Sequence, residues 1–455
     1  MYNLVYINTH DTGRRISPYG YNVPTDNLLD FSKDATVFTN CFCCGPTCSP
    51  SRAAMLTGTY PSQNGMLGLA QRGFSLYHPE NHLANYLKSH GYDTAISGIQ
   101  HETGWYLDLD VDAVKKLGYD DVLTTSSKEF IKEDLHIWDE NNLDKAIEWL
   151  RQHDNSKPFM LAYGMHSTHR PYPIKVDEDI DERYIKTPFA SDNNAANRHD
   201  EAQFMTSAKH ADINVGRLID TLKELGLYDN TVIMYTTDHG VANPFHKCTL
   251  SDRGIGVSLI IRHPQVGHGI VVDNLVSHID IFPTVMDLLG LEKPQYLEGI
   301  SFAKMFNDKD ISTRDAIYAE INFHTSYEPV RCIRTSRYKY VRFYDDYNKL
   351  NLSNIDESIP KSELMKNGLD EYRKPMEALY DLYYDAEEMH NLIDDIRYED
   401  IKNNLKDKLN KMMEDINDPL LKGELPVLPG YKVNKRECIM ASSKNPEDYD
   451  VRGRY

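Results

Sequence analysis

The chain has 455 residues, and 50 Lys and Arg against 69 Asp and Glu give it a formal net charge of −19 at pH 7. Hydrophobic residues make up 40% and charged residues 26%, a balance that excludes wholesale disorder. An acidic chain of this kind is a poor candidate for non-specific binding to nucleic acid or to an anionic membrane, since both need a basic surface. Its length favours one or two domains with a large core.

The apolar runs and the cysteines restrict the setting of the protein. The longest apolar runs, such as residues 257–261, fall far short of the ~18 residues that cross a bilayer. The start, MYNLVYINTHD, has no basic region, so we expect no secretory signal and a cytoplasmic location if Met1 is the native start. Four of the seven cysteines crowd into residues 41–48, which favours a reduced compartment over a disulfide framework. Their spacing lacks the paired CxxC units of a structural zinc site.

Short apolar strands alternate with helical stretches over the first two thirds of the chain. We predict strands over residues 4–7, 93–97, 159–163, 232–235 and 258–261. A helical segment is expected over residues 83–89 and a long helix over residues 202–225. Five apolar positions of the long helix are expected to pack on the sheet: Ile213, Val215, Leu218, Leu222 and Leu225. This alternation predicts an α/β fold, a large mostly parallel sheet flanked by helices, with reactive groups at the carboxyl ends of its strands.

The sequence pattern changes beyond about residue 310. Residues 338–343 and 378–382 favour strands of a small antiparallel sheet, whereas the polar residues 345–375 favour no element. A final helix is indicated by apolar residues at helical spacing: Ile401, Leu405, Leu409 and Met412. We therefore predict a catalytic α/β domain over residues 1–325 and a smaller C-terminal α+β subdomain over residues 326–455.

The most specific motif is the run Cys48-Ser49-Pro50-Ser51-Arg52, which continues to Leu56-Thr57-Gly58. Pro50 suits the first turn of a helix, where its missing N–H costs nothing, so we expect Cys48 at a helix N-terminus. Free amides and the helix dipole favour an anion at that end. Arg52, one turn further on, shares the face of Cys48, and its planar guanidinium fits a tetrahedral oxyanion.

This run resembles the signature of the type I sulfatases, within the alkaline-phosphatase-like superfamily. Further similar segments at residues 224–231, 280–284 and 379–382 extend the resemblance over most of the chain. It implies a sulfatase fold and the hydrolysis of sulfate esters or sulfamates. It also implies that a separate maturation enzyme oxidises Cys48 to formylglycine, whose hydrated aldehyde is the nucleophile.

The resemblance implies a divalent metal, usually Ca²⁺, held by polar residues that follow two strands. His10 and Asp11 follow the first predicted strand, and Asp238 and His239 follow the fourth. We expect these four residues and the side chain at Cys48 to contact the metal. His10 stands where the family usually has Asp. Calcium prefers oxygen ligands whereas imidazole suits Mn²⁺ or Zn²⁺ better, so the identity of the metal stays open.

Further matches supply the remaining catalytic groups that the resemblance implies. His101 ends a Gly-x-x-His motif in which Ile99 replaces the lysine that usually contacts the sulfate. His169 matches the residue that touches the scissile group, and we expect it to protonate the leaving atom while His101 accepts a proton. Lys247 matches a basic residue that grips the anion. The implied catalytic set is Cys48, Arg52, His101, His169 and Lys247.

The segment that follows the Cys48 motif, from Tyr60 to Met66, makes the chain most similar to the sulfamidases, or heparan N-sulfatases. N-sulfoglucosamine is therefore the leading substrate. Four residues are candidates to contact the saccharide, although three of them could equally be ordinary surface residues: His166, Gln71, Arg72 and Glu102. Two alternatives stay open. One is a phosphonate monoester or phosphodiester hydrolase of the same superfamily, which the missing lysine could suit, and the other is a non-catalytic binder of sulfated glycans.

Overall fold

The computed structural model describes residues 1–104, 110–443 and 445–450. Its strands are β1 (Asn3–Thr9), β2 (Thr36–Phe38), β3 (Cys41–Phe42), β4 (Asp93–Gly98), β5 (Asp121–Val122), β6 (Phe159–Gly164), β7 (Thr231–Thr237), β8 (Gly256–Val257), β9 (Leu259–Arg262), β10 (Ile270–Val272), β11 (Val276–Ser277), β12 (Ala316–Phe323), β13 (Tyr327–Thr335), β14 (Tyr338–Phe343) and β15 (Glu377–Asp381). Its α-helices are α1 (Asp26–Ser32), α2 (Cys48–Thr57), α3 (Pro61–Asn64), α4 (Leu83–Ser89), α5 (Val111–Lys115), α6 (Leu135–Gln152), α7 (Ala195–Glu224), α8 (Asp252–Ile255), α9 (Ile281–Leu289), α10 (Ile359–Lys366) and α11 (Glu399–Asp415).

The largest sheet has the strand order β10-β2-β9-β7-β1-β6-β4-β5. Its central strands β7, β1, β6 and β4 pair in parallel, whereas β9 runs antiparallel to both of its neighbours. The prediction of a mostly parallel sheet flanked by helices is therefore confirmed. The strand expected at residues 258–261 is β9, and its reversed direction was not predicted because a short apolar run carries no information on strand direction.

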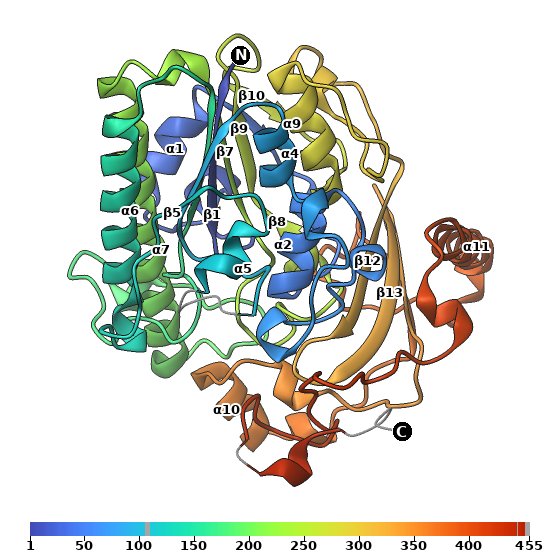
Figure 1. The fold of residues 1–455 in the computed structure, drawn as a ribbon. Coiled ribbons are helices and arrows are strands. Elements are labelled where there is room, and N and C mark those ends of the chain that lie inside the picture. The colour runs from blue at the N-terminus through green and yellow to red at the C-terminus, as the bar shows by residue number, and fades with distance from the viewer. Residues whose placement is uncertain (105–109, 444, 451–455) are drawn as a thin grey trace.

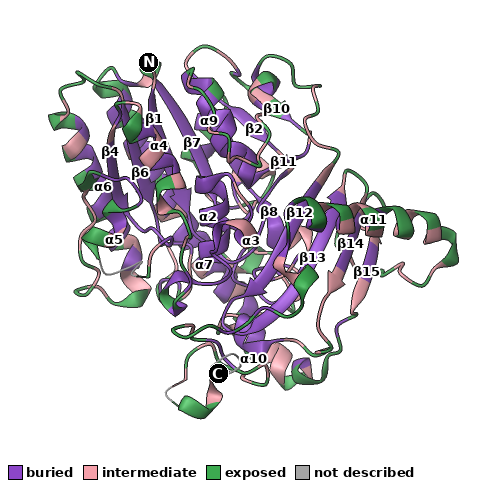
Figure 2. Cartoon of the chain, turned by 45° about the vertical axis from the view of Figure 1, so that its right-hand side comes forward, coloured by how far each residue is buried: buried purple, intermediate pink, exposed green. Residues whose placement is uncertain are grey.

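Helices cover both faces of this sheet (Figure 1). Leu4 and Tyr6 of β1 pack in the hydrophobic cluster that includes α4 and α9, while Val5 and Ile7 pack in the cluster that includes α6 and α7. Successive side chains of a strand point to opposite faces, so the continuous apolar run of β1 is explained by burial on both sides. Figure 2 shows the same arrangement as a buried centre with exposed residues on the outer helices.

Helix α7 corrects two sequence predictions. Val215, Leu218 and Leu222 are buried as predicted, but Ile213 and Leu225 are 42% and 37% exposed. The prediction was wrong for Ile213 because residues two apart point to different sides of a helix, and Ile213 is two residues from Val215. It was wrong for Leu225 because the helix ends at the residue before it.

The C-terminal part contains an antiparallel sheet of order β12-β13-β14-β15. The strand predicted at residues 338–343 is β14, and helix α11 packs Leu405 and Leu409 against the sheet. Strands β12 and β13 were not predicted, and β12 begins before residue 326. The predicted boundary at residues 325 and 326 falls between β12 and β13, which belong to the same sheet. It stays a prediction. In the described ranges, no helix combines the length and the apolar character needed to cross a membrane.

Candidate active site

Two neighbouring parallel strands bring the predicted metal donors together. His10 and Asp11 follow β1 directly, Asp238 and His239 follow β7 directly, and the two strands are paired in register up to their last residues. Asp11 adopts a left-handed backbone conformation with φ 47°, which Asp tolerates better than most residues. In this conformation its backbone N–H donates a hydrogen bond to Asp238 Oδ1 at 2.9 Å, which joins the two strand ends.

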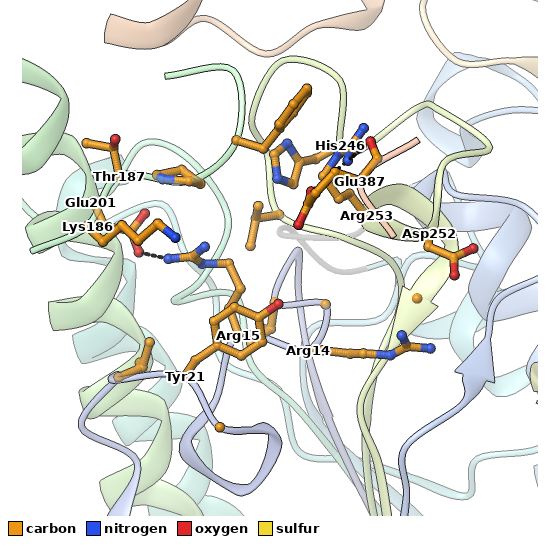
Figure 3. A pocket seen from close by; sticks show the side chains of 18 of the residues that line it. Arg14, Arg15, Tyr21, Lys186, Thr187, Glu201, His246, Asp252, Arg253 and Glu387 are labelled. Atoms are coloured by element: carbon orange, nitrogen blue, oxygen red, sulfur yellow. Dashed lines mark hydrogen bonds and ion pairs between the residues drawn. The ribbon is translucent and has the colours of Figure 1, made fainter. Parts of the chain in front are cut away.

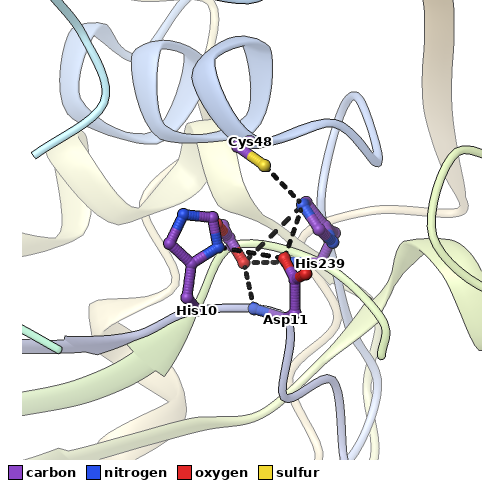
Figure 4. A group of neighbouring side chains, drawn as sticks. His10, Asp11, Cys48 and His239 are labelled. Atoms are coloured by element: carbon purple, nitrogen blue, oxygen red, sulfur yellow. Dashed lines mark hydrogen bonds and ion pairs between the residues drawn. The ribbon is translucent and has the colours of Figure 1, made fainter. Parts of the chain in front are cut away.

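Helix α2 begins at Cys48, as the position of Pro50 predicted. The chain is extended at Thr47 before the helix, and Gly58 ends it in the left-handed conformation with φ 67°. All of α2 is buried, and its first residue lies against the strand-end residues. Cys48 Sγ is 3.4 Å from His239 Nε2 (Figure 4).

Five potential ligand atoms form one compact, fully buried group. The atoms belong to His10, Asp11, Cys48, Asp238 and His239, and all lie within 4.8 Å of one another. His10 Nδ1 is 2.9 Å from Asp11 Oδ1 and 3.0 Å from Asp238 Oδ2, so its ring nitrogen points between the two carboxylates (Figure 4). The mixed oxygen and nitrogen donors, buried and converging, fit a divalent metal.

Two cations keep the buried carboxylates ionised. Lys247 Nζ is 2.8 Å from Asp11 Oδ2, and Arg52 Nε is 3.1 Å from Asp238 Oδ2. Burial alone would raise the pKa of Asp11, but Lys247 and the nearby histidines hold it well below its usual range. Burial would likewise raise the pKa of Asp238, and the surrounding imidazoles and Arg52 lower it. Both carboxyl groups are therefore charged, the form in which a carboxylate binds a cation.

The three further histidines surround the ring of His10. Ring centroids lie 4.7 Å from His10 for His169 and 5.7 Å for both His101 and His166. Burial lowers the pKa of His101 and of His166 well below the usual value, so both are neutral. His169 is the most accessible, with a side chain 20% exposed, and its Nε2 is 3.4 Å from Lys247 Nζ.

Asp139 on α6 holds the loop that carries His166 and His169. Its carboxylate accepts hydrogen bonds from the backbone N–H of His166 at 2.8 Å and of Ser167 at 2.7 Å. Burial raises the pKa of Asp139 to about 7 in spite of these bonds. Asp139 therefore positions the histidine loop from behind, without reaching the group of ligand atoms.

The predicted saccharide contacts have different surroundings. Gln71 Oε1 is 2.7 Å from His101 Nε2, and Glu102 accepts a hydrogen bond from the backbone N–H of His101 at 2.9 Å. Arg72 instead donates to the carbonyl of Lys432 at 2.9 Å and to Asn434 Oδ1 at 3.0 Å. The structure thus brings Gln71 and Glu102 to the site, whereas the guanidinium of Arg72 is committed to the C-terminal segment.

Two residues beside Lys247 were missed by the sequence analysis. Asp356 Oδ2 is 3.0 Å from Lys247 Nζ. His324 is buried nearby, and burial together with the charge of Lys247 lowers its pKa to about 3. Asp356 lies in the polar stretch 345–375, which has no periodicity to indicate a site. His324 directly follows β12, so a correct prediction of that strand would have drawn attention to it.

The sequence matches a known family over the part of the chain that forms the main sheet. The sequence pattern of the sulfatase family matches residues 2–291, well over half of the chain. The chain belongs to the sulfatase family. This sulfatase is accordingly a sulfuric ester hydrolase, and the prediction made from the Cys48 motif is confirmed. A second pattern, described as N-sulphoglucosamine sulphohydrolase, C-terminal, matches residues 238–372.

Relatives and solved structures are similar over nearly the whole sulfatase. An ulvan-active sulfatase of Formosa agariphila is 27% identical, over 84% of this chain and 74% of its own. Human N-sulphoglucosamine sulphohydrolase is 23% identical, over 92% of this chain and 91% of its own. A solved structure of a protein in complex with its substrate D-glucosamine-2-N,6-O-disulfate is 20% identical, with a TM-score of 0.68 over 92% of this chain and 98% of that one. This last likeness shows a shared fold.

Proposed function

We propose that this sulfatase releases sulfate from a sulfated saccharide, with N-sulfoglucosamine as the leading substrate unit. The observation that carries the proposal is the position of Cys48, at a helix N-terminus and against a buried group of carboxylate and imidazole ligands. The match of residues 238–372 to the C-terminal pattern of the N-sulphoglucosamine sulphohydrolases supports the choice of sugar. The human relative, which carries that name, supports it as well.

The nucleophile in this proposal is formylglycine made from Cys48 by a maturation enzyme of the host. Burial raises the pKa of the Cys48 thiol well above its usual value, since the opposing charge of Lys247 is countered by the carboxylates of Asp11 and Asp238. Little thiolate is therefore present near neutral pH, and the thiolate is the nucleophilic form of cysteine. An oxygen nucleophile at this position is consistent with the acidic, oxygen-rich surroundings.

Four residues would hold the metal: His10, Asp11, Asp238 and His239. When bound there, a divalent cation supplies positive charge that favours an anionic oxygen nucleophile. Because His10 offers a nitrogen where an oxygen ligand is usual, we propose Mn²⁺ or Zn²⁺ in preference to Ca²⁺.

The remaining groups of the chain bind the sulfate and move protons. Arg52 and Lys247 provide two cations for the charge that develops on the sulfate oxygens. His169, the accessible histidine, protonates the leaving nitrogen or oxygen. His101 donates its Nε2 proton to Gln71, which leaves Nδ1 as the basic nitrogen that accepts a proton when the aldehyde re-forms.

Ile99 limits how much charge the site can bind. Its side chain is buried in an apolar cluster with Leu135 and Trp138, so this position contributes no cation. Recognition of the reacting group therefore depends on Arg52 and Lys247. This arrangement supports a substrate that presents a single sulfate at the reaction centre.

Two measurements on protein from its own host test the proposal. Mass spectrometry of the peptide spanning residues 41–52 is expected to show formylglycine at position 48. Turnover is then compared on N-sulfoglucosamine, glucosamine 6-O-sulfate, an aryl sulfate and an aryl phosphonate, with N-sulfoglucosamine expected to be fastest. Full activity with an unmodified thiol would overturn the mechanism, and faster turnover of the phosphonate would replace the sulfatase proposal with the phosphonate alternative.

A further inference from the structure

A second cavity lies behind the loops that carry the metal donors. It has a volume of about 580 Å³. Thr12 and Gly13, which follow Asp11, form part of its wall, as does Val241, which follows the Asp238-His239 pair closely. The backbone N–H of Gly13 donates to the carbonyl of His239 at 2.9 Å, so the two loops are joined where they border the cavity.

The cavity is strongly cationic in a chain that is acidic overall. Five basic residues line it: Arg14, Arg15, Lys186, Arg253 and Arg334. Three acidic residues line it as well: Glu201, Asp252 and Glu387. Five positive charges against three negative charges leave a surplus of two, whereas the whole chain carries −19. A local surplus of this sign indicates an anionic ligand.

Three of the arginines already have an acidic partner. Arg15 forms an ion pair with Glu201 (Figure 3). Arg253 is 2.8 Å from Glu387, and Arg334 is 2.9 Å from Asp252. These pairs neutralise the three acids and fix the guanidinium groups around the cavity.

Arg14 and Lys186 provide the surplus. Among the described residues neither forms an ion pair. Arg14 Nη2 donates only to the carbonyl of Cys41, at 2.9 Å, and its buried Nε has no hydrogen-bond partner. Lys186 is exposed, and its side chain turns toward the same space as Arg15 and Tyr21 (Figure 3). Within the described part of the chain, two cations without an ion-pair partner thus border one cavity.

Aromatic rings give the cavity a second recognition feature. The guanidinium carbon of Arg253 lies 3.9 Å from the ring centre of Phe189, and that of Arg15 lies 5.3 Å from the ring centre of Tyr21. Such contacts orient the long cationic side chains. Apolar rings beside a few placed charges, in a cavity of this volume, suit an organic ligand better than a small inorganic ion.

We propose that this cavity is a second anion site, which binds a saccharide fragment bearing two negative groups, sulfate or carboxylate, without reacting with it. Two negative charges on the ligand would balance the surplus of Arg14 and Lys186, and the sugar rings would lie against Tyr21 and Phe189. Inorganic sulfate shares the anionic chemistry but would fill only part of the volume. The site adds a binding function to the proposed hydrolysis, and none of its residues acts in that reaction.

The test uses the full chain with Cys48→Ala, so that the ligand is bound without being turned over. Calorimetric titration at low salt uses a disaccharide with one N-sulfate and one uronic acid carboxylate, and inorganic sulfate separately. We expect two disaccharide sites. Adding Lys186→Glu cancels the surplus charge and is expected to weaken one of them by about tenfold or more. The matched control is Lys175→Glu, the same charge change at an exposed lysine outside the cavity.

Three results would overturn the second site. The first is that the Cys48→Ala chain binds only one disaccharide, and that this binding is lost when Arg52→Ala removes a residue of the reaction centre. The second is an equal effect of Lys186→Glu and Lys175→Glu. The third is binding of inorganic sulfate as tight as that of the disaccharide. Because these measurements need no turnover, a failure of the proposed hydrolysis leaves them interpretable.

Discussion

The reaction centre has two sides that are built differently. On one side, the candidate metal donors follow two parallel strands of the main sheet, and Cys48 begins a buried helix. On the other side, Asp356 and His324 approach Lys247 from beyond the main sheet. Lys247 lies between the sides, 2.8 Å from Asp11 and 3.0 Å from Asp356. We infer that the strand-end side determines the reaction type and that the other side adjusts how the anion is held.

The largest expected effect is at the strand-end side. Cys48→Ala removes the group that becomes the nucleophile, so we expect turnover to fall by about a thousandfold or more. Steady-state kinetics on the best substrate measures it. The matched control is Cys44→Ala, since Cys44 is also buried but contacts Ser277 instead of the ligand atoms. Comparable activity in the two variants would contradict the assignment of Cys48.

A smaller effect is expected on the other side. Asp356→Asn leaves Lys247 with Asp11 as its single carboxylate partner, which draws the ammonium group away from the sulfate. We expect kcat/KM to fall by roughly tenfold to a hundredfold, mainly through KM if Lys247 binds the ground state. Asp370→Asn, at an exposed residue of the same region, is the control. Equal kinetics for the two variants would show that Asp356 has no part in anion binding.

The strand-end side was predictable because its signals are local. An apolar strand followed at once by Asp238 and His239 can be recognised in a few residues, and so can a cysteine placed before Pro50. Asp356 could not be recognised in this way, because its role depends on a contact with Lys247, far away along the chain. Arg72 shows the converse: its local setting suggested a pocket residue, and its bonds to Lys432 and Asn434 became visible only in the folded chain.

The secondary structure likewise divides into elements that the local sequence predicts and elements that it does not. Strands β1, β4, β6, β7 and β9 of the main sheet were found from their apolar runs, and β14 was found with its observed ends, whereas the short strands β2, β5 and β10 were missed. Strand β13 was missed, because it contains Pro329 and two arginines, and the buried Arg331 is paired with Asp418 and Glu320. A buried charge paired with a distant residue leaves no pattern of strand periodicity in the sequence.

The donor set itself offers a third prediction, concerning metal preference. Wild-type protein, freed of metal by a chelator, is expected to bind Mn²⁺ or Zn²⁺ more tightly than Ca²⁺. His10→Asp replaces the nitrogen with oxygen ligands, and we expect it to shift the ratio of affinities toward Ca²⁺ by about tenfold. Equilibrium dialysis with each metal measures this, with His78→Asp, at an exposed histidine, as the control. An unchanged ratio would show that His10 does not contact the metal.

The smallest expected effect is on stability and concerns Asp139, whose carboxyl binds the backbone of the loop that carries His166 and His169. The pKa of Asp139 is about 7, above its usual value of 3.8, because its carboxyl is buried. Between these values the folded chain keeps a proton that the unfolded chain has released, so the contribution of Asp139 to stability falls as the pH rises from about 4 to about 7. The loss is on the order of 1 kcal/mol per pH unit.

Asp139→Asn removes this titration while its amide oxygen can still accept the N–H groups of His166 and Ser167. Urea unfolding at about pH 5 and at about pH 7 is therefore expected to show a smaller loss of stability in the variant than in the wild type. Glu140→Gln, the next residue on α6 and exposed to solvent, is expected to keep the wild-type dependence. If Asp139→Asn and Glu140→Gln have the same dependence on pH, the Asp139 carboxyl is ionised in the folded chain throughout this range. The loop that carries His169 would then be held by a charged group.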